Sequence, residues 1–285
     1  MTFFITGIDT GIGKTLATGL AARWLHQHEK KVITQKLVQT GQTSPISEDV
    51  LEHRRLMGIA PLPEDLEGTT CPYSFAYPAS PHLAARLEGC TIEPNHITQA
   101  TKTLQERYEI VLLEGAGGFL VPLTPDLLLA DYIEQQGYPV ILVTSGRLGS
   151  INHTLLTIAA IRQRNLPLAC IVFNQYPAPD AVIGTDSLAI FRRICPNVVA
   201  MPSLGHISNW SGIASVIPAH AEIQGDRHHT QCLDSGFRRN DSFFAQTNLG
   251  YAPETDCVPD VDFSCIYDAV IRHSAPSHAS VRSSF

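Results

Sequence analysis

The sequence predicts an α/β protein with a mostly parallel sheet and helices on both faces. Three observations support this prediction: apolar runs alternate with helical patterns, most of the runs are continuous, and the first run leads into a glycine-rich loop. Continuous apolar runs are typical of strands that are covered on both faces. Alternation of such runs with helices is typical of parallel sheets, since each crossover places a helix on one face.

The predicted strands are the apolar runs at residues 2–6, 31–35, 110–114, 140–144, 169–173 and 198–201. The predicted helices lie between or beside them, at residues 14–28, 48–57, 82–88, 95–107, 128–136, 151–164 and 186–194. Ligands of open α/β sheets bind beyond the carboxyl ends of the strands. Polar residues at those ends are therefore the first candidates for a functional site.

The composition limits the classes of function. The chain has 285 residues, of which 44% are hydrophobic and 16% charged, and its net charge is −7. These values suit a buried α/β core, and the acidic balance without a basic run disfavours nucleic acid as a partner. No apolar stretch reaches the roughly 20 residues that span a bilayer, and no charged leader precedes the first strand. We therefore expect a cytoplasmic protein that binds neither nucleic acid nor membrane.

The loop after the first strand is built to hold phosphate. Residues 7–15 read Gly-Ile-Asp-Thr-Gly-Ile-Gly-Lys-Thr. In such a loop the glycines let backbone N–H groups face an anion, the lysine binds terminal phosphates, and the threonine hydroxyl ligates Mg²⁺. The helix that follows directs its positive end at the same anion. Five residues rather than the usual four separate Gly7 from Gly13, yet the pattern still predicts a P-loop NTPase-like fold that binds a nucleotide.

Three polar residues follow other predicted strands and complete a candidate site. Lys36 comes directly after the second strand, Glu114 ends the third, and Asn174 ends the fifth. Glu114 near the Thr15 hydroxyl would suit Mg²⁺, which prefers hard oxygen ligands, and Asp49 at a helix start is a candidate second carboxylate. A lysine such as Lys36 would stabilise charge during phosphoryl transfer.

Five segments in order and spacing resemble the dethiobiotin synthetase family. They are Thr-Gly-Ile-Asp-Thr-Gly-Ile-Gly-Lys-Thr (6–15), Gln-Lys-Leu-Val-Gln-Thr-Gly (35–41), Pro-Ala-Ser-Pro-His (78–82), Val-Leu-Leu-Glu-Gly-Ala-Gly-Gly (111–118) and Gly-Arg-Leu-Gly-Ser-Ile-Asn-His-Thr-Leu-Leu-Thr (146–157). The resemblance runs from about residue 2 to residue 205, and the longer phosphate loop is that family's form. It implies ATP- and Mg²⁺-dependent carboxylation and ring closure of 7,8-diaminopelargonate with CO₂, giving dethiobiotin, ADP and phosphate in a homodimer.

The resemblance also implies a role for each matching residue. Lys36 and Lys14 would be catalytic, and Thr15, Asp49 and Glu114 would hold Mg²⁺. The nucleotide would contact Gly11, Ile12, Gly13, Lys14, Thr15, Leu16, Asp49, Glu114, Gly115, Ala116, Gly117, Asn174 and Gln175, with Asn174 reading the adenine edge. The diamine would contact Thr10 and Thr40, and its carboxylate would be held by Gly149, Ser150, Ile151 and Asn152 of a second subunit.

The chain departs from this family after residue 205. The segment 204–210 lacks the proline of the family's adenine-closing loop, and residues 216–224 and 233–241 resemble translated dispersed repeats. We expect a ligase domain at 1–208, a loop-like or disordered insertion at 209–259, and a possible terminal helix and tail at 260–285. A binding arm that uses the pair His228 and His229 is the alternative for the insertion.

Three other functions remain open at this stage. Another P-loop amide or amine ligase would usually carry a glutaminase domain, for which this chain is too short. A partitioning-type ATPase would place a signature lysine early in the loop, where this chain has Asp9. A degenerate nucleotide-binding protein is disfavoured, because Lys14, Thr15, Lys36 and Glu114 are all present.

Overall fold

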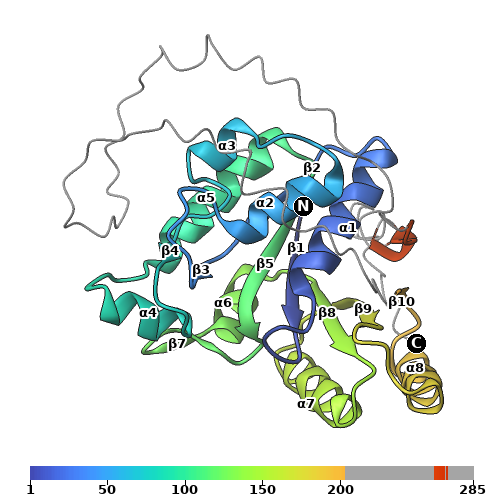
Figure 1. Cartoon of the computed structure of the whole chain (residues 1–285). Helices are drawn as coiled ribbons and strands as arrows, with labels where there is room; N and C mark the ends of the chain where they lie inside the picture. The colour runs from blue at the N-terminus through green and yellow to red at the C-terminus, as the bar shows by residue number, and fades with distance from the viewer. Residues whose placement is uncertain (203–259, 267, 269–285) are drawn as a thin grey trace, which may run out of the picture.

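A computed structural model describes residues 1–202, 260–266 and 268. Its main sheet has six strands in the order β10-β9-β8-β1-β5-β2, and every neighbouring pair is parallel (Figure 1). The strands are β1 (Thr2–Gly7), β2 (Val32–Lys36), β5 (Ile110–Gly118), β8 (Val140–Ser145), β9 (Leu168–Asn174) and β10 (Val198–Met201). The predicted α/β class is therefore confirmed.

The helices follow the predicted order with small shifts at their ends. They are α1 (Lys14–Gln27), α2 (Glu48–Met57), α3 (Pro63–Leu66), α4 (Pro81–Leu87), α5 (Pro94–Arg107), α6 (Leu129–Gln136), α7 (Ser150–Gln163) and α8 (Ala181–Ile194). Helix α8 begins five residues before its predicted start, because the Asp180 side chain accepts hydrogen bonds from the N–H groups of Val182 and Ile183. Helix α3 was not predicted, since four residues are too short to show a helical period.

Two short strand pairs lie outside the main sheet. Strand β3 (Gln39–Thr40) pairs in parallel with β4 (Ser74–Phe75), and β6 (Pro122–Thr124) pairs antiparallel with β7 (Leu127–Leu128). The sequence did not predict them, because strands of two or three residues carry no detectable alternation. The pairing of β3 with β4 fixes the path of the chain just after β2.

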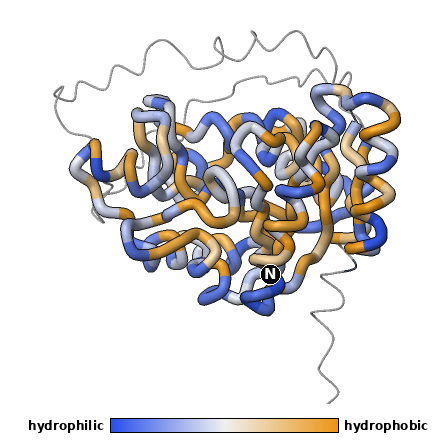
Figure 2. Tube along the Cα trace, turned by 90° about the horizontal axis from the view of Figure 1, so that it is seen from below, coloured by the Kyte–Doolittle hydropathy of each residue, from blue (hydrophilic) through white to orange (hydrophobic). Residues whose placement is uncertain are grey.

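Apolar residues fill a core on each face of the main sheet. Along β1, Phe3 and Ile5 belong to one core with residues of α1 and α2, whereas Phe4 belongs to the other core with residues of α4 to α8. Successive strand residues point to opposite faces, so a strand buried on both sides must be apolar throughout. In Figure 2 the hydrophobic segments run through the interior, and hydrophilic segments lie mostly at the periphery.

A late segment of the chain packs into the core on the α1 side. Val261, Phe263 and Ile266 are buried there against the β9–β10 side of the sheet, and residues 264–266 are helical. These residues lie within the predicted terminal helix and tail. The predicted insertion at 209–259 and the altered loop at 204–210 lie outside the described residues.

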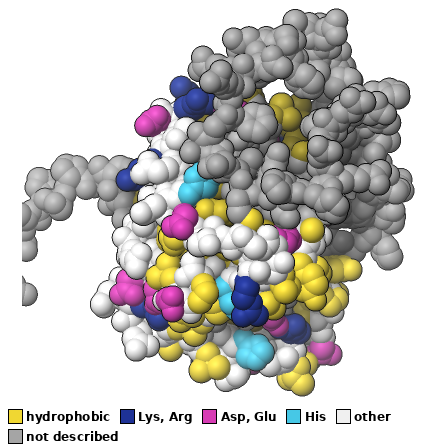
Figure 3. Space-filling view, turned by 90° about the vertical axis from the view of Figure 1, so that its left-hand side faces the viewer, with side chains coloured by type: hydrophobic (Ala, Val, Ile, Leu, Met, Phe, Trp, Pro, Cys, Tyr) yellow, Lys and Arg dark blue, Asp and Glu magenta, His cyan; other side chains and the backbone are white. Residues whose placement is uncertain are grey.

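The surface of the described residues mixes chemical types. On the face shown in Figure 3, acidic, basic, histidine and hydrophobic side chains are interspersed. Within the described ranges no helix combines the length and the apolar character needed to cross a membrane.

Candidate active site

The phosphate loop joins β1 to α1 and is shaped by glycines. Gly11 and Gly13 have φ of 67° and 99°, in the left-handed region that favours glycine. A side chain at Gly13 would also collide with Asn174, whose Nδ2 would lie 2.5 Å from the added Cβ. Ile12 is buried between these two glycines, while Gly11 is exposed. The loop is thus open toward solvent and closed toward the core.

Lys14 opens α1 and is almost fully buried. Its Nζ donates to the backbone carbonyl oxygen of Asp9, 3.1 Å away in the same loop. Burial and the nearby positive charge of Lys36 lower the pKa of Lys14 to about 8. A triphosphate in the loop would supply the missing negative charge. The next residues, Thr15 and Leu16, are partly buried, and Leu16 packs against the core on the α1 side.

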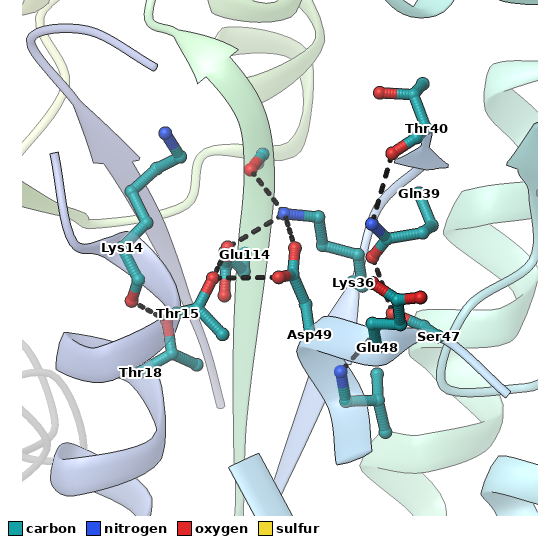
Figure 4. Close-up of polar contacts among 12 residues, drawn as sticks. Lys14, Thr15, Thr18, Lys36, Gln39, Thr40, Ser47, Glu48, Asp49 and Glu114 are labelled. Atoms are coloured by element: carbon teal, nitrogen blue, oxygen red, sulfur yellow. Dashed lines mark hydrogen bonds and ion pairs between the residues drawn. The ribbon is translucent and has the colours of Figure 1, made fainter. Parts of the chain in front are cut away.

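Four side chains from separate elements meet beside the loop (Figure 4). Lys36 Nζ lies 2.5 Å from Asp49 Oδ2 and 2.8 Å from Glu114 Oε1. Thr15 Oγ1 lies 3.0 Å from Asp49 Oδ1 and 3.1 Å from Glu114 Oε1. The register of the sheet explains half of this cluster, since Lys36 on β2 is directly opposite Glu114 on β5.

The structure corrects two details of the strand ends. Lys36 is the last residue of β2 and does not follow that strand, whereas Asn174 is the last residue of β9, as predicted. Glu114 lies inside β5, which continues to Gly118. The small residues Gly115, Ala116 and Gly117 allow this continuation through a crowded region, where a Cβ on Gly115 would lie 2.8 Å from the Phe4 ring.

Mutual attraction sets the charges in this cluster. Burial by itself would lower the pKa of Lys36, but the carboxylates of Glu114 and Asp49 outweigh it and raise the pKa above its ordinary value. Burial would likewise raise the pKa of Glu114, yet Lys36 and a hydrogen bond from His53 hold that pKa well below its ordinary value. The lysine is therefore a cation and Glu114 an anion at neutral pH.

The oxygens of this cluster fit a magnesium ion shared with a nucleotide. The Thr15 hydroxyl lies one hydrogen-bond length from a carboxylate oxygen of Asp49 and from one of Glu114. Magnesium usually takes one or two carboxylates and fills its other positions with water and substrate phosphates. In the part of the chain that the structure describes, no three histidine, cysteine or acidic side chains form a metal-binding group by themselves.

Asn174 connects β9 to the phosphate loop. Its Nδ2 donates to the backbone carbonyl oxygen of Ile12 at 2.9 Å, and its Oδ1 accepts from the N–H of Tyr176 at 3.0 Å. The side-chain amide has a second N–H hydrogen and a second oxygen lone pair. An adenine edge would need one donor and one acceptor of this kind. The next residue, Gln175, is partly buried and its N–H donates to the Met201 carbonyl oxygen.

The residues predicted for the diamine lie around the rim of the site. Thr40 is on β3, where its carbonyl oxygen accepts from Gln39, and Thr10 is exposed on the phosphate loop. Thr10 lines a cleft of about 530 Å³, together with residues 118–122 and with His153, Leu156 and Thr157 of α7. The cleft lies within the size range of small-molecule sites.

The helix start predicted to bind a carboxylate lies near the phosphate loop in the same chain. Gly149 precedes α7 with φ of 91°, and no side chain caps this helix. Ser150 is buried against Ser145, Ile151 is partly buried and Asn152 is exposed. Arg147, two residues before Gly149, forms an ion pair with Asp9 of the phosphate loop.

Sequence reasoning missed His53. Its ring is fully buried on α2, and its Nε2 lies 2.8 Å from Glu114 Oε2. Asp49 and His53 are four residues apart, which places both on one face of a helix. That spacing is the signal that would have found the histidine.

Comparison with known proteins agrees with this geometry. A family model described as an AAA domain matches residues 1–216. The ATP-dependent dethiobiotin synthetase BioD of Chlorobaculum tepidum is 54% identical over 64% of this chain and 76% of its own length. The ATP-dependent dethiobiotin synthetase BioD 2 of Pasteurella multocida is 52% identical over 67% of this chain and 89% of its own length.

Among solved structures, the chain aligns with an AMPPNP-bound plasmid partition protein of Borrelia burgdorferi over 71% of this chain and 86% of that one. The identity is 14% and the TM-score 0.44, values too low to support a conclusion about function. The sequence relatives are decisive, because they match at more than half identity over most of their own length. This chain belongs to the dethiobiotin synthetase family.

Proposed function

We propose that this chain catalyses ATP- and Mg²⁺-dependent carboxylation and ring closure of 7,8-diaminopelargonate with CO₂, releasing dethiobiotin, ADP and phosphate. The observation that carries the proposal is the position of Lys36. Its Nζ is buried between Asp49 and Glu114 at the ligand edge of the sheet, beside the phosphate loop. The names of the relatives supply the substrate class, and they favour this reaction over the other P-loop ligases and over the partitioning ATPases.

The reaction needs two cations where negative charge accumulates. One amine of the diamine attacks CO₂, loses a proton and becomes a carbamate. A carbamate oxygen then attacks the γ-phosphorus of ATP, and the bond to ADP breaks. Lys14 at the start of α1 and Lys36 at the end of β2 would stabilise the charge on these oxygens, as preorganised cations do in a site that excludes water.

Ring closure needs orientation more than acid–base chemistry. The second amine attacks the carbonyl carbon of the carbamic–phosphoric anhydride, and phosphate leaves with its bonding electron pair. The hydroxyl groups of Thr10 and Thr40 can bind the diamine. Binding of this kind would hold the second amine within reach of the activated carbamate that forms on the first. No covalent enzyme intermediate is required.

Mg²⁺ fits the oxygens of Thr15, Asp49 and Glu114, which would hold it beside the phosphates. When bound, this ion would neutralise charge on the β- and γ-phosphate oxygens of ATP. In the described structure Lys36 occupies the space between the two carboxylates. Its long, flexible stem allows the ammonium group to move toward the γ-phosphate when the carboxylates take a metal ion.

We also propose a homodimer in which α7 of one subunit completes the diamine site of the other. The uncapped start of α7 can hold a carboxylate, because its first N–H groups and its dipole favour an anion. Leu148, Leu155 and Leu156 are exposed on this helix and the loop before it, as is Leu120 on the neighbouring loop. Leu156→Asp should shift the mass in analytical ultracentrifugation to one subunit, whereas Val182→Asp on α8 should not. A monomeric wild-type protein would contradict this part.

The proposed location is the cytoplasm, which supplies ATP. The decisive experiment measures phosphate release with ATP, Mg²⁺ and bicarbonate, in the presence and absence of 7,8-diaminopelargonate. Release should require the diamine, and mass spectrometry should find dethiobiotin in equal amount. Lys36→Met should lower the release by at least about 10²-fold, while Lys102→Met, which removes an exposed lysine of α5, should leave it unchanged. ATP hydrolysis that ignores the diamine would refute the proposal.

A further inference from the structure

A row of buried polar side chains extends behind Glu114, away from the phosphate loop. His53 Nε2 lies 2.8 Å from Glu114 Oε2, and His53 Nδ1 lies 3.0 Å from Thr34 Oγ1. Arg54 Nη1 donates to the same Thr34 oxygen at 2.8 Å, and Arg54 also forms two hydrogen bonds with Asp65, at 2.9 and 2.8 Å. All five side chains are at most 2% exposed. Every partner in this row is therefore a protein group.

The donors and acceptors in the row assign the hydrogen of the imidazole. The guanidinium of Arg54 can only donate, so Thr34 Oγ1 must accept from it. The hydroxyl hydrogen of Thr34 then has His53 Nδ1 as its acceptor, and the ring hydrogen belongs on Nε2. If Nδ1 carried the hydrogen, the Thr34 hydroxyl would be left without an acceptor among these groups. The ring thus donates from Nε2 to Glu114.

Because of this hydrogen bond, the two carboxylate oxygens of Glu114 have different partners. Oε2 receives the His53 hydrogen bond, while Oε1 faces Thr15 and Lys36, at 3.1 and 2.8 Å. A carboxylate held at one oxygen cannot rotate without losing that bond. The other oxygen is consequently kept aimed at the place where the metal and the γ-phosphate would lie.

We propose that His53 is a positioning residue, which orients Glu114 for Mg²⁺ through a tautomer that Thr34 and Arg54 select. This inference rests on the proposed function, because it assumes that Glu114 binds the metal. Outer partners of metal-binding carboxylates typically change metal affinity or activity by about 10- to 100-fold when they are removed.

Two substitutions of His53 separate positioning from space filling. His53→Gln keeps an N–H near the position of Nε2, whereas His53→Met keeps apolar volume and removes the donor. The probe is Mn²⁺ in the presence of saturating AMPPNP, with free Mn²⁺ read by electron paramagnetic resonance. Mn²⁺ affinity should fall about tenfold in His53→Met and by less than about threefold in His53→Gln. Thermal unfolding of both variants identifies the temperature range in which each is folded.

A second pair of variants, at Thr34, tests the tautomer without changing the His53 ring. Thr34→Val removes the hydroxyl that selects the Nε2 hydrogen, and Thr34→Ser keeps it. Mn²⁺ affinity should fall about threefold in Thr34→Val and stay at the wild-type value in Thr34→Ser. Unchanged affinity in both His53→Met and Thr34→Val would overturn the inference, as would equal losses in His53→Gln and His53→Met.

The same measurement distinguishes this inference from the proposed function. Mn²⁺ binding with AMPPNP requires no diamine, so it reports on His53 even if the wild-type protein shows no diamine-dependent phosphate release. The activation constant for Mg²⁺ in that release assay should change in the same ratio as the Mn²⁺ affinity, with the maximal rate less affected. A change in the maximal rate alone, with the metal affinity intact, would contradict positioning of the metal ligand.

Discussion

At the ends of β2 and β5, charged side chains are buried against one another, whereas the β9–β10 side of the same sheet is packed with apolar residues and one amide. The first region contains Lys36 and Glu114, and the second contains Asn174, Met201 and the late residue Phe263. Both regions lie on one sheet, and Asn174 ends its strand at the same edge as Lys36. Attraction between opposite charges stabilises the first region, and burial of apolar side chains stabilises the second.

The difference teaches that the charged region is built for a ligand, whereas the apolar residues around Asn174 serve the fold. Ion pairs that are taken out of water recover their desolvation cost only when each charge finds its partner. Lys36 has such partners, since Glu114 and Asp49 raise its pKa. The pKa of Lys14 is instead lowered to about 8. Lys14 is therefore the cation that lacks sufficient negative charge until phosphate arrives.

The largest effect should come from breaking the charged cluster. Lys36→Met leaves Glu114 and Asp49 facing each other without a cation, and loss of one partner from a buried pair costs about 3–5 kcal/mol. Diamine-dependent phosphate release should fall by about 10²–10³-fold or more. Urea unfolding and the release assay measure the two effects, with Lys102→Met as the control. A variant as stable as the wild type would show that the pair contributes no net stability.

The next effect should be confined to stability. Phe263→Ala removes a fully buried ring from the core between α1 and β9–β10, and such truncations cost about 3–5 kcal/mol. At a temperature where the variant is folded, its affinity for ATP should stay within about twofold of the wild-type value. Ser264→Ala, at the exposed neighbouring position, serves as the control. A loss of ATP affinity without a loss of stability would mean that the two regions are not separable.

Lys14→Met should stabilise the nucleotide-free protein while it weakens ATP binding. The pKa of Lys14 falls from 10.5 unfolded to about 8 folded, so the folded state binds fewer protons between these values and stability rises with pH across that window. Below pH 8 the buried ammonium is a cost, and its removal should add about 1–3 kcal/mol at pH 7. Unfolding measured from pH 7 to pH 10.5 should show the rise in the wild type and a flatter curve in the variant. A destabilised variant at pH 7 would contradict the lowered pKa.

The smallest effect should come from the exposed pair that joins the phosphate loop to the start of α7. The side chains of Arg147 and Asp9 are 47% and 46% exposed, and pairs of this kind contribute about 0–1 kcal/mol. Arg147→Gln should change the free energy of unfolding by less than about 1 kcal/mol, and the difference should vanish in 1 M salt. A loss above about 2 kcal/mol would show that this exposed pair contributes to stability on the scale of the buried ion pairs.

Much of the fold was predictable because its signals are local. The apolar runs predicted all six strands of the main sheet, and the helical patterns predicted every described helix except α3. The phosphate loop, Lys36 and Glu114 were also identified, since each lies at or next to the end of a strand pattern that can be read over a few residues. The predicted contacts of these residues with ATP, Mg²⁺ and the diamine stay predictions.

Other features could not be predicted because they depend on which elements become neighbours. Nothing near residue 36 specifies that β2 pairs with β5, yet this register places Lys36 opposite Glu114. Asn174 contacts Ile12 across 162 residues of sequence, and Phe263 returns to a core begun by Phe3. Contacts of this kind leave no periodic trace in the chain.

The sequence by itself determined the class of fold and the phosphate loop, because strand and helix periods and glycine conformations are properties of short segments. Only the tertiary structure decided how the charges are shared, since the charge state and aim of a buried group depend on its neighbours in space. His53 is the clearest case. In the sequence it is a histidine on a helix, and in the fold it holds one oxygen of Glu114 while the other faces the phosphate loop.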